Sequence, residues 1–137
     1  MAVKYYYASQ EYQSEDDAQA AVVTLKGRLE NNPTDWMEVK EITESADGAW
    51  QVNPTKLTDS QILNPDNSKT YMAYGKVSGI HVMPLTSTDL MAKINEFRAF
   101  YGQHLSADVI YKFDDSTEPP TETTITPTTD MSVYMIG

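Results

Sequence analysis

The chain has 137 residues and is acidic, with 20 Asp and Glu against 10 Lys and Arg and a formal net charge of −10. This length predicts one domain that buries its own core, and the absence of cysteine excludes disulfides, thiolate nucleophiles and cysteine-based metal centres. The negative charge disfavours nucleic acid and anionic membranes as direct partners, because both are bound mainly through basic residues.

A strand–helix–strand unit is predicted in the N-terminal part of the chain. Residues 4–8 alternate in the manner of a strand, and residues 36–43 show a similar alternation. Between them, Ser14 is a suitable N-cap, and apolar side chains then recur at steps of three and four residues. The proline-containing turn at residues 31–33 ends this pattern, so we predict a helix over residues 14–30.

The middle of the chain contains several turn signals. The pair Asp47-Gly48 lies between two short apolar runs, which predicts a β-hairpin. Residues 57–63 are compatible with a short helix, and the polar run at residues 64–68 predicts a turn.

A second strand–helix–strand unit is predicted over residues 70–113. Strand-forming residues extend from 70 to 83, with a bulge or turn expected near Gly79. Thr86 is the predicted cap of a helix that reaches His104, and a last strand of the unit follows at residues 107–113.

The end of the chain differs in composition. Residues 114–130 are rich in Thr, Pro and acidic residues, which predicts an extended, solvated spacer that spans at most ~55 Å. Residues 131–136 are mostly apolar and are predicted to form a strand that pairs within the chain or with a neighbour. We therefore divide the chain into a core at 1–113, a spacer at 114–130 and a C-terminal strand or arm at 131–137.

Two such units joined by a hairpin predict an α+β fold. The expected architecture is a ferredoxin-like βαββαβ sandwich, with one antiparallel sheet and two helices on one face. The central hairpin region is enlarged, and the C-terminal arm is added to this core. The alternative is another α+β fold in which residues 36–83 form a larger meander.

The sequence contains no pattern that predicts catalytic, cofactor-binding or metal-binding residues. His81 and His104 are the only histidines, and neither has a ligand at metal-site spacing. The acidic run at residues 15–17 is explained by its position at a helix start. The tyrosines at residues 5–7, with Tyr71 and Tyr74, resemble the aromatic residues that stack bases on the sheet of RNA-recognition domains. The basic–aromatic signature of that family is absent, and cross-strand packing of the tyrosines is the simpler interpretation.

Two functional hypotheses from different classes remain. The first is a non-enzymatic structural or assembly protein that self-associates through sheet edges and the C-terminal arm. The second is a ligand-binding or enzymatic domain with a site on an open sheet face. The first is favoured, because an extended spacer that ends in an apolar strand is suited to an exchanged arm. The candidate interface residues are Met131, Val133, Tyr134, Met135, Ile136, Tyr6 and Trp50.

In size, acidity, absence of cysteine and terminal arm, the whole chain resembles small virion proteins of tailed bacteriophages. The proteins that it resembles are head-decoration, neck and tail-completion subunits. The resemblance rests on the organisation of the whole chain and on no specific motif. It implies a virion component whose partners are further copies of itself and other virion proteins. No signal peptide or stretch of ~20 apolar residues is present, so we expect synthesis inside the cell and no membrane partner. The resemblance implies a final place in the virion.

Overall fold

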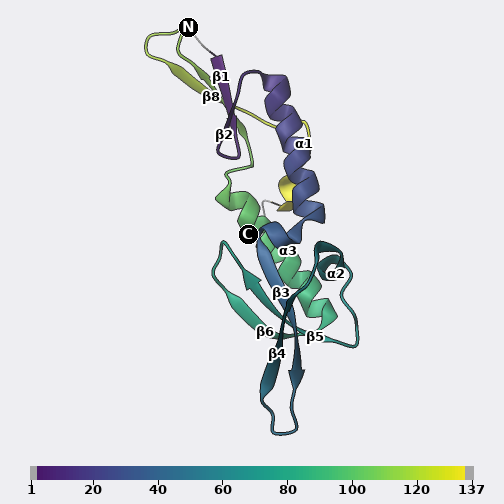
Figure 1. Ribbon diagram of the computed structural model, residues 1–137. Coiled ribbons are helices and arrows are strands. Elements are labelled where there is room, and N and C mark those ends of the chain that lie inside the picture. The colour runs from purple at the N-terminus through teal and green to yellow at the C-terminus, as the bar shows by residue number, and fades with distance from the viewer. Residues whose placement is uncertain (1–2, 135–137) are drawn as a thin grey trace.

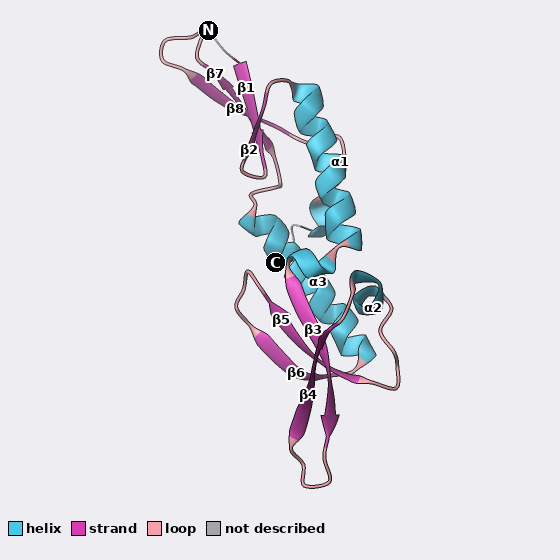
Figure 2. Cartoon of the chain, in the orientation of Figure 1, coloured by secondary structure: helices cyan, strands magenta, loops and turns pink. Residues whose placement is uncertain are grey.

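The computed structural model describes residues 3–134 and has an α+β architecture with two separate four-stranded antiparallel sheets. The molecule is elongated, with one sheet at each end (Figure 1). Two long helices, α1 (Glu15–Asn31) and α3 (Ser87–His104), run beside sheet A and sheet B respectively and approach each other in the middle of the molecule (Figure 2). The α+β class predicted from the sequence is confirmed.

The first sheet, sheet A, combines two strands from the N-terminal part of the chain with two strands from residues 110–125. Its strand order is β2-β1-β7-β8, where β1 is Val3–Tyr7, β2 is Gln10–Tyr12, β7 is Ile110–Asp114 and β8 is Thr121–Ile125. The inner face of sheet A packs against α1. The fully or nearly fully buried residues of this core are Tyr7, Ala18, Val22, Leu25, Leu29, Ala107, Ile110, Met131 and Tyr134.

The second sheet, sheet B, is formed by the middle of the chain. Its strand order is β4-β3-β5-β6, where β3 is Met37–Glu44, β4 is Trp50–Lys56, β5 is Thr70–Gly75 and β6 is His81–Leu85. The short helix α2 (Asp59–Leu63) and α3 cover its inner face. The core between them contains Trp36, Met37, Val39, Leu57, Ile62, Tyr71, Ala73, Leu85, Leu90, Ile94 and Phe97.

The predicted helix starts and hairpin turn are confirmed. The Ser14 hydroxyl accepts a hydrogen bond from the Asp17 backbone N–H at the start of α1, as an N-cap should. Thr86 and Asp89 form a reciprocal capping box at the start of α3. Gly48 has a φ of +86°, which the turn between β3 and β4 requires and which glycine adopts without steric cost.

The prediction of a single ferredoxin-like sheet is not met, because the strands of each predicted unit separate. In the first unit, β1 belongs to sheet A and β3 to sheet B; in the second, β5 and β6 belong to sheet B and β7 to sheet A. Helix α1 therefore carries the chain from one sheet to the other instead of returning it to the sheet it left. The alternation of a strand identifies its buried face but not its partner strand, so the sequence pattern is the same in both arrangements.

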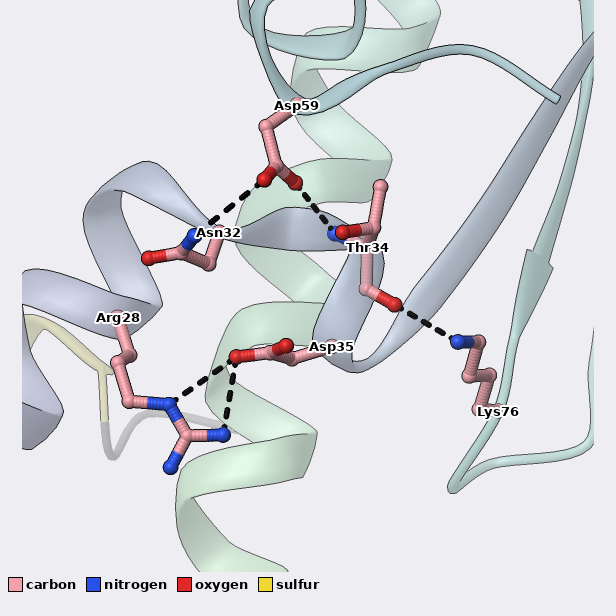
Figure 3. Close-up of polar contacts among 6 residues, drawn as sticks. All are labelled: Arg28, Asn32, Thr34, Asp35, Asp59 and Lys76. Atoms are coloured by element: carbon pink, nitrogen blue, oxygen red, sulfur yellow. Dashed lines mark hydrogen bonds and ion pairs between the residues drawn. The ribbon is translucent and has the colours of Figure 1, made fainter.

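Polar contacts fix the junction where α1 passes into β3 through the 3-10 turn η1 (Pro33–Asp35) (Figure 3). The Asn32 side-chain amide and the Thr34 backbone N–H donate to the Asp59 carboxylate at 3.3 and 2.9 Å. On the other side, Lys76 Nζ donates to the Thr34 carbonyl at 2.7 Å. These contacts tie the turn to α2 and to the loop after β5, so β3 leads away from sheet A.

The C-terminal part of the chain also differs from the prediction. Within the expected spacer, residues 121–125 form β8, which pairs with β7 over its full length. The prediction of a strand at residues 131–136 is wrong for Ser132–Tyr134. These residues form a 3-10 turn, η2, which packs against α1 and α3. Residues 135 and 136 lie outside the described residues. The division of the chain at 113 and 130 stays a prediction.

Candidate interaction surfaces

The candidate interface residues from the sequence occupy three different environments. Tyr6 and Trp50 are half-buried on the sheet faces that point away from the helices. Met131 and Tyr134 are buried in the chain's own core, with 4 % and 8 % of their surface exposed, whereas Val133 between them is 72 % exposed. Met135 and Ile136 lie outside the described residues.

The outer face of sheet B lies on the side opposite the core that α2 and α3 share with the sheet, and it carries apolar side chains around Ile42. The register places Ile42 opposite Thr70 on β5 and opposite Val52 on β4, so these three side chains share the outer face. Ile42 is only 2 % exposed although it lies on this side of the sheet. By the same register, the outer face of sheet B contains Glu38, Lys40, Ile42, Glu44, Trp50, Val52, Lys56, Thr70, Met72, Tyr74 and His81. Met83 is placed on this face by its alternation with the inner residue Val82.

The charges on the outer face of sheet B balance. Its four charged residues are two acidic and two basic, Glu38 and Glu44 with Lys40 and Lys56, whereas the whole chain carries −10. Lys56 Nζ lies 2.9 Å from Glu38 Oε1, and this hydrogen bond lowers the pKa of the Glu38 carboxyl. A second acidic chain therefore meets little repulsion at this face.

The outer face of sheet A is smaller and more polar. Tyr6 lies opposite Tyr111 on β7 and opposite Glu11 on β2, and Phe113 lies opposite Lys4. The Tyr6 hydroxyl donates to Glu11 Oε1 at 3.3 Å, and Lys4 Nζ lies 3.6 Å from the same oxygen. The aromatic rings of this face are thus partly engaged in cross-strand contacts.

A groove of about 630 Å³ lies between α1, the β1–β2 hairpin and the C-terminal end of α3. Its α1 side presents mainly small or short side chains, and its other side is aromatic. Asp17 lies toward the start of α1 and Arg28 toward its end. The lining residues are Tyr7, Ala8, Gln10, Tyr12, Asp17, Ala20, Ala21, Thr24, Leu25, Arg28, Tyr101 and Leu105.

Arg28 is held at its end of the groove by an ion pair (Figure 3). Its Nε and Nη2 donate to Asp35 Oδ2 at 3.1 and 3.0 Å. This hydrogen-bonded carboxylate, with a smaller contribution from Tyr101, raises the pKa of the Arg28 guanidinium above its ordinary value. Because the arginine stays charged, this end of the groove keeps a fixed cation beside the Asp35 carboxylate.

Sequence reasoning missed this groove because it missed β2. The turn that joins β1 to β2 consists of Ala8 and Ser9, with φ values of +50° and +67°, a conformation usually marked by Asn or Gly. The available signal was Tyr12, which lies opposite Tyr5 and on the same face as Tyr7. Three-residue strands seldom give a recognisable alternation.

The C-terminal segment docks on the chain itself through Arg98. The Arg98 guanidinium lies 5.9 Å from the centroid of the Trp36 ring and 5.6 Å from that of Tyr134, and its Nε donates to the Leu29 carbonyl at 2.8 Å. Burial lowers the pKa of Arg98 from its ordinary value. Earlier in this segment, the backbone N–H and the hydroxyl of Thr128 donate to the Gln19 side-chain oxygen on α1.

The histidines and acidic clusters lie in structural positions. The ring of His81 stacks on Tyr74 with centroids 4.3 Å apart, and His104 is the last residue of α3. Glu15, Asp16 and Asp17 form the first turn of α1, where the helix dipole favours negative charge. Residues 3–134 contain no group of three or more His, Cys, Asp or Glu arranged to hold a metal ion.

Comparisons with known proteins return no relative. No family model, curated protein or solved structure matches this chain. Within the described part of the chain, none of the helices is both long enough and apolar enough to cross a membrane.

Proposed function

We propose that this protein is a non-enzymatic assembly component, and that copies of it associate through the outer face of sheet B. The observation that carries the proposal is the set of exposed apolar side chains on the face of sheet B that lies opposite the core shared with α2 and α3. Val52 is 43 % exposed and Met83 is 39 % exposed, with Trp50, Met72 and Tyr74 half-buried beside them. Exposed apolar side chains that share one face of a sheet are typical of protein interfaces.

The charge distribution supports a second copy as the partner. Two chains that each carry −10 repel one another over most of their surfaces. The outer face of sheet B is locally neutral, and it combines carboxylates and lysines that can pair across a two-fold axis. Both the apolar and the charged residues of this face are therefore compatible with face-to-face association.

The proposal differs from the sequence-based hypothesis in the surface it uses. Met131 and Tyr134 are buried in their own chain, so the C-terminal segment is not needed to cover a neighbour. Strand β4 is an edge strand of sheet B among residues 3–134. It contains Pro54, which has no N–H for a further strand, and its register with β3 shifts between Lys40 and Ile42. Both features disfavour edge-to-edge pairing at β4 and favour contact through the face.

We further propose that the assembly is a virion of a tailed bacteriophage. Support for this part is the resemblance in size, acidity and absence of cysteine, together with an elongated molecule that has a sheet face at each end. Mass spectrometry of purified phage particles tests it directly. Detection of peptides from this chain at many copies per particle is expected, and particles that lack the chain would refute the virion assignment.

Self-association is tested by light scattering coupled to size-exclusion chromatography. We expect the full chain to have a molar mass of at least twice that of one chain. Val52→Lys should lower this mass toward that of a monomer, because it places a charge among the apolar side chains of the face. The matched control is Val23→Lys, which introduces a lysine in place of a valine that is 59 % exposed on α1. A full chain of monomeric mass at high concentration would refute the proposal and favour a ligand-binding domain with a site on this open face.

A further inference from the structure

We propose that the groove beside α1 binds an extended peptide segment of a partner protein, which adds as a strand to β2. In the bound arrangement, the N-terminal, basic end of the peptide lies near Asp17 and its C-terminal, acidic end lies near Arg28. This site is separate from the outer face of sheet B, and the inference does not depend on self-association.

The free edge of sheet A supplies the main-chain contacts. Strand β2 is the last strand on its side of sheet A within residues 3–134, so one edge of Gln10–Tyr12 has no strand partner there. An added strand recovers these backbone hydrogen bonds, which is the basis of peptide recognition by strand addition.

The groove lies directly beneath that edge and accepts alternate side chains. Gln10 and Tyr12 both line the groove, whereas Glu11 between them points to the outer face of sheet A. A strand paired with β2 follows the same alternation, so every second side chain of the peptide enters the groove. The facing surface of α1 is formed by Ala20, Ala21 and Thr24, which leave room for side chains.

The volume and composition of the groove fit a short peptide. Its volume of about 630 Å³ lies within the range of ~300–1,000 Å³ that is typical of ligand sites. Tyr7, Tyr12 and Tyr101 give it an apolar wall, and the Tyr7 hydroxyl is already used as a donor to the Ala107 carbonyl. Apolar, β-branched peptide side chains suit this wall.

The charged ends set the length and direction of the peptide. Asp17 and Arg28 are eleven positions apart on one helix, which corresponds to about 16 Å, or about five residues of extended chain. Strand β2 runs opposite to α1 (Figure 1), so a peptide antiparallel to β2 runs parallel to α1. Its N-terminus then meets Asp17, and its C-terminus meets the guanidinium of Arg28, which shares its charge with Asp35.

The test is a titration of the ¹⁵N-labelled full chain with the pentapeptide Lys-Val-Thr-Val-Glu, followed by amide chemical shifts. We expect saturable changes at millimolar peptide, concentrated on residues 8–12 and 17–28. The reversed-charge peptide Glu-Val-Thr-Val-Lys is expected to bind about fivefold more weakly, which corresponds to the ~1 kcal/mol of an exposed ion pair.

Matched variants separate the groove from other surfaces. Ala20→Trp fills the groove and should abolish the shift changes, with Thr24→Trp as a second variant if the first does not fold. Val23→Trp places the same residue on the exposed side of α1 and should bind as the unmodified chain does. Absence of shift changes with either peptide, equal binding by Ala20→Trp and Val23→Trp, or changes confined to the outer face of sheet B would each overturn the inference. The last outcome would leave the proposed self-association surface intact.

Discussion

A single buried hydroxyl links the first strand to the last turn before β7. Tyr7 is 1 % exposed, and its hydroxyl donates to the Ala107 carbonyl at 2.9 Å, across a hundred residues of sequence. Burial is the main reason that the pKa of Tyr7 is raised to about 12, and the nearby Asp108 carboxylate adds to this effect. The stabilising contribution of the neutral Tyr7 side chain is therefore lost as the pH rises into the alkaline range.

The sign of this dependence follows from the two pKa values of Tyr7. Above pH ~10 the unfolded chain loses the tyrosine proton while the folded chain keeps it until about pH 12. The free energy of unfolding should therefore fall by about 2–3 kcal/mol over this window, a contribution that is fully present below pH ~10. Urea denaturation from pH 8 to 12 measures it.

Tyr7→Phe is the control for the pH experiment. It should cost about 1 kcal/mol at pH 8, through the lost hydrogen bond, and should have a shallower decline above pH 10. The other tyrosines are common to both proteins, so the difference between the two curves isolates Tyr7. Parallel curves for the two proteins would contradict the assignment.

At the scale of elements, the C-terminal segment packs against both long helices. Met131 and Tyr134 belong to the core beneath sheet A, and the Tyr134 ring lies against Arg98 of α3. Arg98 in turn bonds the Leu29 carbonyl near the end of α1. One short turn therefore contacts both helices, and its loss affects the junction rather than one sheet.

Tyr134→Ala should lower the free energy of unfolding by about 2–4 kcal/mol, because it removes a buried ring and its contact with Arg98. The adjacent Val133→Ala, at a position that is 72 % exposed, should change it by less than about 0.5 kcal/mol. Thermal denaturation at several protein concentrations measures both. A loss that grew on dilution would indicate that the segment docks on a neighbouring chain, against the arrangement described here.

At the scale of the whole molecule, the two hydrophobic cores formed by residues 3–134 have Tyr101 in common. Tyr101 of α3 packs against both cores, and its ring meets Trp36 edge-on with centroids 6.5 Å apart. Each core has its own sheet and its own long helix. Cooperative unfolding of the molecule therefore depends on a small shared contact region at the junction.

Tyr101→Ala should uncouple the two cores as well as destabilise them, by about 2–4 kcal/mol in total. Scanning calorimetry should then show a calorimetric enthalpy that exceeds the van't Hoff enthalpy, the mark of more than one cooperative unit. Phe100→Ala is the matched control, since that neighbouring ring is 45 % exposed and belongs to neither core. A single sharp transition in Tyr101→Ala would show that the coupling lies elsewhere.

The sequence by itself determined the local elements of this protein. Ser14 and Thr86 mark helix starts because their side chains cap backbone N–H groups close in sequence, and Asp47-Gly48 marks a hairpin because its turn geometry is local. The tertiary structure decided which strands share a sheet, that residues 121–125 pair with β7, and that a groove lies beside α1. These features depend on contacts between distant residues, such as those of Asp59 with Asn32 and Thr34, and alternation in a strand carries no information about its partner.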